Sequence, residues 1–283
     1  MTDVYILSAT RTAIGTFGGA LSAMPPVDIA AQAAKAAISR AGLAPDQIGT
    51  VVFGHVINTE PRDMYLSRVA AMQAGVPETV PAMNVNRLCG SGAQAIVSAT
   101  QALMLGDAGI ALAGGAECMS RSPYSLPAVR WGQKMGDTKA IDMMTGALTC
   151  PFGTGHMGVT AENVAAQAGI TRADQDAFAL ESQTRAARAI AEGRFVAEIA
   201  PVEISGRKGN FDFAVDEHPK ATTAEALAGL RPAFQKDGTV TAGNASGLND
   251  GAAALVLATG AAAKGLKPGR GSWAGPLQAW TPR

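Results

Sequence analysis

The chain has 283 residues, of which 47% are hydrophobic and 16% are charged, with 33 glycines. This composition is typical of a compact α/β protein packed with small side chains, and it excludes a disordered chain or a helical bundle. The 23 basic and 23 acidic side chains cancel to a formal charge of zero, so no broad field attracts nucleic acid or an anionic membrane. An anionic ligand therefore needs a local binding site.

The N-terminus and the cysteines bear on the cellular compartment. Met1 is not followed by a basic segment and an apolar run, and no stretch approaches the roughly 20 apolar residues of a membrane span. The three cysteines, Cys89, Cys118 and Cys150, have neither metal-site spacing nor the density of a secreted disulfide scaffold. We therefore expect a cytoplasmic protein with reduced thiols and no metal.

Short apolar runs alternate with helical patterns along the chain. Strands are predicted at residues 4–7, 50–53, 110–112 and 252–257, and helices at 28–41 and 66–74. Gly42 follows the first helix in the manner of a C-terminal cap. Short strands between helices predict a sheet that is covered by helices on both faces.

Two later helices are predicted from their N-terminal caps. Thr171 and Asp174 have the spacing of a capping box, with Asp in place of the usual Glu, and Gly193 ends the helix. Thr222 and Glu225 have the same spacing and open a shorter helix.

Between residues 117 and 158 the chain has neither helical nor strand periodicity. This segment is rich in Gly, Pro, Ser and Met and is longer than an ordinary connection. It is therefore interpreted as a functional excursion from the main fold. The chain has no internal repeat and no low-complexity tract.

Cys89 is the candidate nucleophile. It lies in residues 81–100, PAMNVNRLCGSGAQAIVSAT, where an extended segment meets Gly90-Ser91-Gly92 and a helix of small residues. The positive end of that helix favours the thiolate, the glycines let a substrate carbonyl approach the backbone, and the unpaired N–H groups can stabilise an oxyanion. A lone cysteine is more often a buried structural residue, but the strand-Cys-Gly-x-Gly-helix context favours the nucleophile.

The VNRLCGSG segment around Cys89 resembles the nucleophile motif of thiolases, also called acetyl-CoA acetyltransferases or β-ketothiolases. Further segments resemble the family in the same order: ILSATRTAIGTFGGAL (6–21), TEPRDMYLSRVAAMQAGVP (59–77), GGAECMSRSPY (114–124), GHMGVTAENVA (155–165), GRKG (206–209), LRPAF (230–234) and VTAGNASGLNDGAAALVL (240–257). The resemblance covers residues 4–257. Many long matches in register make it specific, whereas GRKG alone would be weak.

The resemblance implies the α/β thiolase fold, with αβαβα layers, of which this chain would hold the N-terminal half and its inserted loop domain. The implied boundaries are 1–118 and 241–259 for the N-terminal domain, 119–240 for the inserted loop domain and 260–283 for an aberrant tail. It also implies a homotetramer, built as a dimer of dimers, in fatty acid metabolism.

The chemistry that the resemblance implies is acyl transfer through Cys89. A thiolate accepts an acyl group from acyl-CoA, and then a second acyl-CoA enolate, or free CoA in the cleavage direction, attacks the thioester. CoA thioesters are substrates, and no cofactor is implied. The CoA contacts carried over from the family are Leu148, His156 and Met157 near the pantetheine arm, Ala242, Ser246 and Leu248 in the AGNASGLN loop, and Lys220 near the nucleotide, where the family often has Arg.

Without the resemblance, these residues have plainer interpretations. His156 would be structural or at the surface, the AGNASGLN loop would be a polar turn, and Lys220 would be solvated. Cys118 stands where the family commonly has Ser, and Cys150 lies at a variable position, so both are interpreted as structural. His55 and His218 match no catalytic motif and are interpreted as structural or exposed.

The end of the sequence departs from the family. The Asn-Glu-Ala-Phe segment, the Gly-His-Pro histidine and the Cys-x-Gly-Gly-Gly cysteine of the second thiolase half do not occur, and residues 260–283 include Trp273 and Trp280. We therefore expect a C-terminal truncation with a frame shift near Pro268, impaired turnover, an exposed apolar face and poor solubility.

Two alternatives to a thiolase-type enzyme stay open. One is an inactive acyl-CoA-binding remnant, which would bind CoA without turnover. The other is a ketoacyl carrier-protein synthase, which also uses a nucleophilic cysteine, although the HMGVTAEN and AGNASGLNDG segments argue against it.

Overall fold

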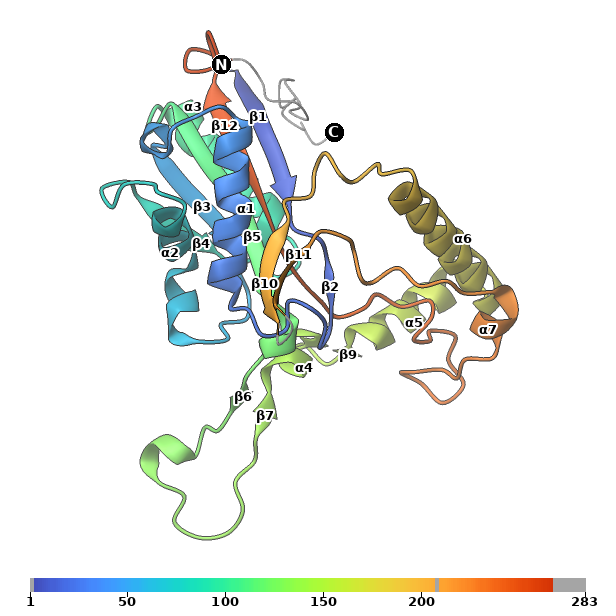
Figure 1. Ribbon diagram of the computed structural model, residues 1–283. Helices are drawn as coiled ribbons and strands as arrows, with labels where there is room; N and C mark the ends of the chain where they lie inside the picture. Colours follow the sequence, from blue (N-terminus) through green and yellow to red (C-terminus); the bar gives the residue numbers. More distant parts are fainter. Residues whose placement is uncertain (1–2, 207–208, 267–283) are drawn as a thin grey trace. The chain divides into compact units, whose positions relative to one another are not determined.

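The computed structural model describes residues 3–206 and 209–266 (Figure 1). These residues form two compact units, of which the first contains 3–121, the described part of 196–215, and 249–266, and the second contains 122–195 and 216–248. This division places 196–215 in the first unit and 241–248 in the second. Trp273, Trp280 and the predicted frame shift at Pro268 lie outside the described residues.

The first unit is built on a mixed β-sheet with the strand order β1-β12-β5-β3-β4. Strand β3 is parallel to both β4 and β5, whereas β12 is antiparallel to both β1 and β5. The short β2 pairs with β12. The strands are β1 (Val4–Arg11), β2 (Gly15–Thr16), β3 (Thr50–Gly54), β4 (Ala82–Val85), β5 (Ile110–Cys118) and β12 (Asn249–Thr259).

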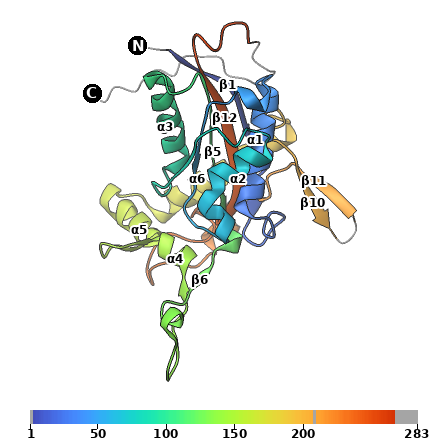
Figure 2. The same ribbon diagram turned by 90° about the vertical axis from the view of Figure 1, so that its left-hand side faces the viewer.

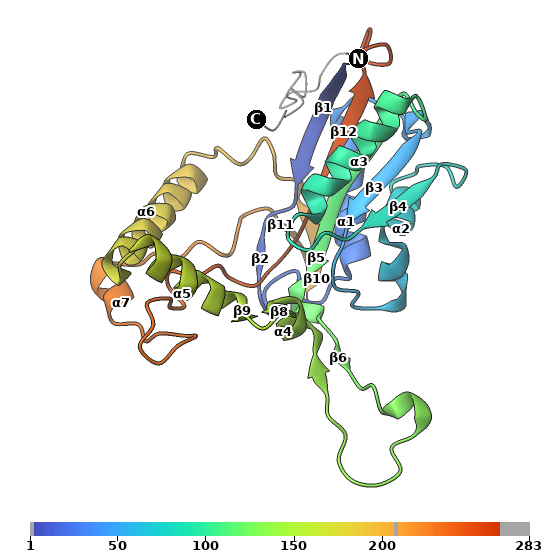
Figure 3. The same cartoon turned by 180° about the vertical axis from the view of Figure 1, so that it is seen from behind.

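Helices cover both faces of this sheet. Helices α1 (Pro26–Arg40) and α2 (Leu66–Gln73) lie on one face, and α3 (Ser91–Leu105) lies on the other (Figures 1, 2 and 3). The predicted sheet with helices on both faces is therefore confirmed. Both predicted helices of this layer are present, and Gly42 has a positive φ of 69° beyond the end of α1.

Small residues let α1 approach the sheet closely. Ala33 and Ala37 are fully buried on α1. The buried hydroxyls of β1 donate hydrogen bonds to their carbonyls, from Ser8 to Ala37 at 2.6 Å and from Thr10 to Ala33 at 3.0 Å. The helix carbonyls thus satisfy polar side chains that would otherwise be buried without partners.

Helix α3 has one buried side and one apolar exposed side. Its buried residues recur every fourth position, at Ser91, Ala95, Ala99 and Leu103. On the other side, apolar residues including Val97 and Leu105 are exposed, Leu105 by 80%. In the described part of the chain, α3 with its preceding turn is the one helix long and apolar enough to cross a membrane. This is weak evidence for a membrane span, because core helices of soluble proteins have the same length and composition.

Strand β5 runs to Cys118, well beyond the predicted residues 110–112. The extension could not be predicted from the sequence, because Gly114 and Gly115 are poor strand formers. Gly114 is required there, since a Cβ would lie 2.4 Å from the Ala253 carbonyl and 2.6 Å from the Phe53 ring.

A two-stranded ribbon completes the first unit. It consists of β10 (Val202–Gly206) and β11 (Gly209–Phe213). Arg40, the last residue of α1, donates hydrogen bonds to the carbonyls of Ala197 and Ile199, each at 2.7 Å, just before the ribbon.

The second unit consists of short strands and helices. They are β6 (Tyr124–Ser125), β7 (Ile141–Asp142), α4 (Met143–Ala147), β8 (Thr149–Cys150), β9 (Gly155–His156), α5 (Met157–Ala168), α6 (Arg172–Ala191) and α7 (Ala224–Ala228). Strands β6 and β7 pair with each other, and every residue of the connecting loop 126–140 is exposed. The predicted excursion therefore holds only short elements until α5 begins.

The predicted caps of α6 and α7 differ in outcome. The capping box of Thr171 and Asp174 is present at the start of α6, as predicted. The prediction that Thr222 caps α7 is wrong, because the hydroxyl of Thr223 accepts the hydrogen bond of the Ala226 N–H, at 3.2 Å. Two consecutive threonines made the register ambiguous, and only the backbone geometry decides between them.

Candidate active site

Cys89 is exposed in the turn between β4 and α3. The hydroxyl of Ser91 fixes this turn, because it accepts the Arg87 N–H at 2.9 Å and donates to the Leu88 carbonyl at 2.6 Å. Leu88 has φ of 48°, the one positive value of a non-glycine residue in the described chain. Such backbone strain persists where surrounding contacts enforce it, often at functional sites.

The start of α3 lies directly on the end of β3, and only glycine permits this contact. A Cβ on Gly54 of β3 would lie 2.6 Å from the carbonyl carbon of Ser91 and 2.8 Å from the nitrogen of Gly92. On Gly115 of β5, a Cβ would lie 3.1 Å from the Gly54 carbonyl oxygen. The backbone beside Cys89 is thus held against the sheet itself.

Two N–H groups of the turn are already engaged. The Gly90 N–H donates to the Arg87 carbonyl at 3.1 Å, and the Ser91 N–H donates to the Leu88 carbonyl at 2.9 Å. The sequence suggested the unpaired N–H groups at the start of the helix as oxyanion donors, and the turn itself uses these two.

His55 and Glu117 join the strand ends beneath this turn. The His55 N–H donates to the Val85 carbonyl at 3.1 Å, and its Nδ1 lies 2.8 Å from the Ala116 carbonyl oxygen. Glu117 accepts the backbone N–H of Val56, and burial raises the pKa of its carboxyl group. His55 is buried, and it links the ends of β3, β4 and β5 through Val85 and Ala116.

The other two thiols differ from each other. Cys118 is buried, and burial, together with the nearby Asp250, raises its pKa to about 12. Cys150 is half-buried, and hydrogen bonds from the Thr154 side chain and from the Phe152 and Thr154 backbone lower its pKa. The structural interpretation therefore suits Cys118, whereas Cys150 is a half-buried thiol whose pKa is lowered.

We expect iodoacetamide at pH 8 to label Cys89 and Cys150 and to leave Cys118 unlabelled. The reagent requires an accessible thiolate, which a buried thiol with a raised pKa does not provide. Peptide mass spectrometry checks this expectation, and the same digest after unfolding in guanidinium serves as the control, because Cys118 should then be labelled. Labelling of Cys118 in the folded chain at the rate of Cys89 would contradict the expectation.

In the second unit, the pairing of β8 with β9 brings three of the predicted CoA contacts together. The Met157 N–H donates to the Leu148 carbonyl at 2.8 Å. His156 caps α5 by accepting the Gly158 N–H on Nδ1 at 3.0 Å. Its ring stacks on the ring of Phe234, with centroids 5.0 Å apart and planes at 16°.

Phe234 connects this group to the AGNASGLN loop. A Cβ on Gly158 would lie 2.2 Å from the Phe234 ring, so only glycine permits their contact. The neighbouring Ala233 N–H donates to the Val240 carbonyl at 2.9 Å, which places the start of the loop beside this segment. Sequence reasoning gave Phe234 no role, although its LRPAF segment was among the matches.

The loop exposes part of the predicted contact set. Ala242 and Ser246 are exposed, and Leu248 is half-buried. Lys220 is exposed, and its backbone N–H donates to the Gln183 side chain of α6 at 2.9 Å. Among the hydrogen bonds and ring contacts of the described residues, none joins Lys220 directly to His156 or to the loop.

Comparison with known proteins covers nearly all of the described chain. The family model for the thiolase N-terminal domain matches residues 4–261. Beta-ketothiolase BktB of Cupriavidus necator is 56% identical over 270 residues, which are 94% of this chain and 68% of that protein. An acetyl-CoA acetyltransferase of the same organism is 49% identical over 273 residues, covering 95% of this chain and 69% of that protein.

Solved structures agree with these matches. Human mitochondrial 3-ketoacyl-CoA thiolase has a TM-score of 0.90 at 41% identity, over 93% of this chain and 67% of that chain. A crystal structure of the human enzyme in complex with CoA has a TM-score of 0.89 at 41% identity, over 93% and 66%. Bacillus anthracis acetyl-CoA acetyltransferase has a TM-score of 0.90 at 46% identity, over 95% and 68%. These matches confirm the predicted fold class.

Proposed function

The chain belongs to the thiolase family, and on this premise we propose that its thiolase-type acyl transfer proceeds through Cys89, with 3-ketoacyl-CoA formed or cleaved by an acyl-cysteine intermediate. The observation that carries this proposal is the exposed thiol on a strained turn, held against the sheet where α3 begins. The thiolate attacks the thioester carbonyl of acyl-CoA, the carbon–sulfur bond to CoA breaks, and CoA leaves as the thiolate.

The substrate contacts proposed for CoA lie in the second unit. Leu148, His156 and Met157 are proposed to contact the pantetheine arm, and the loop with Ala242, Ser246 and Leu248 to contact it as well. Lys220 is proposed to lie near the nucleotide end. Their support is the grouping of His156 with the loop through Phe234, and the relative at 41% identity that was crystallised with CoA.

We propose that these 283 residues become acylated but turn over slowly. Condensation requires a base for the nucleophile and a second thiol that moves the enolate proton. Cys118, the other thiol of the first unit, is buried with a pKa of about 12, so it does not exchange protons readily at neutral pH. The assembly as a homotetramer or dimer of dimers is proposed on the family resemblance alone, and the cytoplasmic location on the pattern of the cysteines.

A measurement of CoA binding distinguishes the proposed function from an inert remnant that binds no CoA. We expect calorimetry to show that the chain binds CoA and that His156→Asn weakens binding about tenfold, because asparagine keeps a capping oxygen for α5 but loses the ring. Phe178→Ala is a matched control, since Phe178 is 77% exposed on α6. Absence of CoA binding by the unsubstituted chain would contradict the proposal.

The remaining alternative, a ketoacyl carrier-protein synthase, differs in its acyl donor. The proposed function requires acetyl-CoA to acylate the chain faster than acetylated acyl carrier protein does. The reverse order would favour the synthase. The relatives described above are all named as thiolases or acetyl-CoA acetyltransferases, which supports the CoA donor.

A further inference from the structure

A buried carboxylate holds the residues that precede the AGNASGLN loop. Glu162 of α5 is 6% exposed, and its Oε1 accepts the Val240 N–H at 2.8 Å. Its Oε2 accepts the Thr239 N–H at 2.9 Å and the Thr239 hydroxyl at 3.0 Å. A single side chain thus binds consecutive donors of a segment that has no regular secondary structure.

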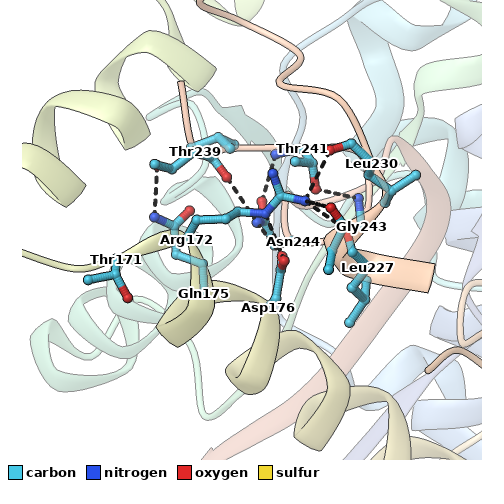
Figure 4. A network of polar contacts seen from close by, with 12 residues as sticks. Thr171, Arg172, Gln175, Asp176, Leu227, Leu230, Thr239, Thr241, Gly243 and Asn244 are labelled. Atoms are coloured by element: carbon cyan, nitrogen blue, oxygen red, sulfur yellow. Dashed lines mark hydrogen bonds and ion pairs between the residues drawn. The ribbon is translucent and has the colours of Figure 1, made fainter. Parts of the chain in front are cut away.

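A second carboxylate, on α6, holds the loop itself (Figure 4). Asp176 is 8% exposed, and its Oδ1 accepts the Asn244 side-chain amide at 2.9 Å. Asn244 in turn accepts the Thr241 N–H at 2.7 Å and donates to the Thr239 carbonyl at 3.1 Å. The two carboxylates therefore act on the same segment, 239–244, from two different helices.

Arg172 extends this network to α7. Its Nε donates to Asp176 at 2.7 Å, and its Nη2 donates to the carbonyls of Leu227 at 2.7 Å and Leu230 at 3.1 Å (Figure 4). The guanidinium group neutralises the buried Asp176 and fixes its carboxylate toward Asn244. Such charge-assisted hydrogen bonds are stronger than neutral ones.

Two glycines, in and beside segment 239–244, lie close to neighbouring side chains. A Cβ on Gly238 would lie 2.2 Å from Glu162 Oε1, and a Cβ on Gly243 would lie 2.5 Å from Leu230 and 2.6 Å from Leu227. The segment is therefore held by hydrogen bonds and packs closely against these side chains. Ala242, between these fixed positions, is exposed.

Glu162 is held in its charged form. Burial by itself would raise the pKa of its carboxyl group, but hydrogen bonds from the Thr239 and Val240 backbone and from the Thr239 hydroxyl outweigh it and lower the pKa. The carboxylate is therefore charged at neutral pH, where it accepts hydrogen bonds on both oxygens.

We propose that Glu162 and Asp176 are positioning residues for CoA, which fix segment 239–244 so that Ala242 and the following Ser246 are presented in the conformation that binds the substrate. This inference rests on the proposed function. Neither carboxylate touches CoA in this proposal. Each lowers the cost of binding by ordering the loop beforehand.

The test compares Glu162→Gln and Asp176→Asn with Glu181→Gln in the full 283-residue chain. Glu181 is the matched control, because it is an acid of α6 that pairs at the surface with Arg185 at 2.6 Å. Calorimetry with CoA gives the dissociation constant and the fraction of binding-competent chain. Deuterium exchange of the peptides that cover 236–248 reports the order of the loop.

We expect Glu162→Gln to weaken CoA binding about tenfold or more. The amide nitrogen of glutamine donates hydrogen bonds, so the side chain cannot accept from Thr239 and Val240 with two oxygens as the carboxylate does. Asp176→Asn should weaken binding in the same direction, and both variants should exchange faster at 236–248. The control should match the unsubstituted chain. A merely structural role would instead lower the binding-competent fraction and leave the dissociation constant of the remainder unchanged.

The outcomes separate the two levels of the proposal. If the unsubstituted chain binds no CoA, the proposed function fails. If it binds CoA and both folded variants bind with the same affinity, the positioning role alone is overturned. Should Glu162→Gln fail to fold, Asp176→Asn decides the matter, since it keeps the volume of the side chain and changes only one oxygen to an amide.

Discussion

Replacing Cys89 with alanine is expected to abolish acetyl transfer from acetyl-CoA to the chain. The sulfur of the thiolate bonds to the acetyl carbon as CoA leaves, and no other group at this turn can form the thioester in its place. Intact-protein mass spectrometry measures the added acetyl group, and a thiol reagent measures the released CoA. Both signals should fall to the level of a sample without acetyl-CoA.

Two controls make this expectation specific. Cys150→Ser removes the half-exposed thiol with the lowered pKa, and Cys118→Ala removes the buried one. Both variants should keep the acetylation of Cys89. If Cys89→Ala is acetylated to the original extent, and the label maps to the peptide of Cys150, Cys89 is not the acyl acceptor.

A methyl group at Gly54 is expected to be the most damaging small substitution near the nucleophile. In Gly54→Ala, the new Cβ would lie 2.6 Å from the Ser91 carbonyl carbon and 2.7 Å from its oxygen. These are backbone atoms, so α3 must move away from the sheet. We expect the free energy of unfolding to fall by about 3 kcal/mol, measured by urea denaturation, and acetylation of Cys89 to slow in the fraction that stays folded.

Gly92 provides the matched control for this substitution. It is the next glycine in the same contact, but a Cβ built on it has no heavy atom within 4 Å. Gly92→Ala should leave the free energy of unfolding unchanged or raise it by about 0.5 kcal/mol, because alanine suits a helix better than glycine. Equal losses in Gly54→Ala and Gly92→Ala would mean that the close approach of α3 to β3 does not determine stability.

The sequence predicted the elements whose signals are local. The helix of α6 could be found because Thr171, Asp174 and Gly193 mark its ends chemically, and β3 because its apolar run is continuous. Strand β5 was cut short because Gly114 and Gly115 carry no strand preference. Their presence is explained by Phe53 and by the carbonyl groups of Ala253 and Gly54, which are distant in sequence.

The candidate site was predictable to a similar extent. The turn at Cys89 could be recognised from its glycines and from the family motif. The roles of Glu162 and Asp176 could not, because each depends on a loop that lies far along the chain from its helix. A buried acid and an exposed acid look alike in sequence, and only their partners distinguish Glu162 from Glu181.

The exposed loop between β6 and β7 has a practical consequence for any preparation of the chain. Arg130, Lys134 and Lys139 all lie in this loop, where every residue from 126 to 140 is exposed. Exposed loop tips are preferred sites of proteolysis. Trypsin should therefore nick the chain first within this loop, and the two fragments should stay associated on a native gel because β12 of the second fragment pairs with β1 and β5 of the first.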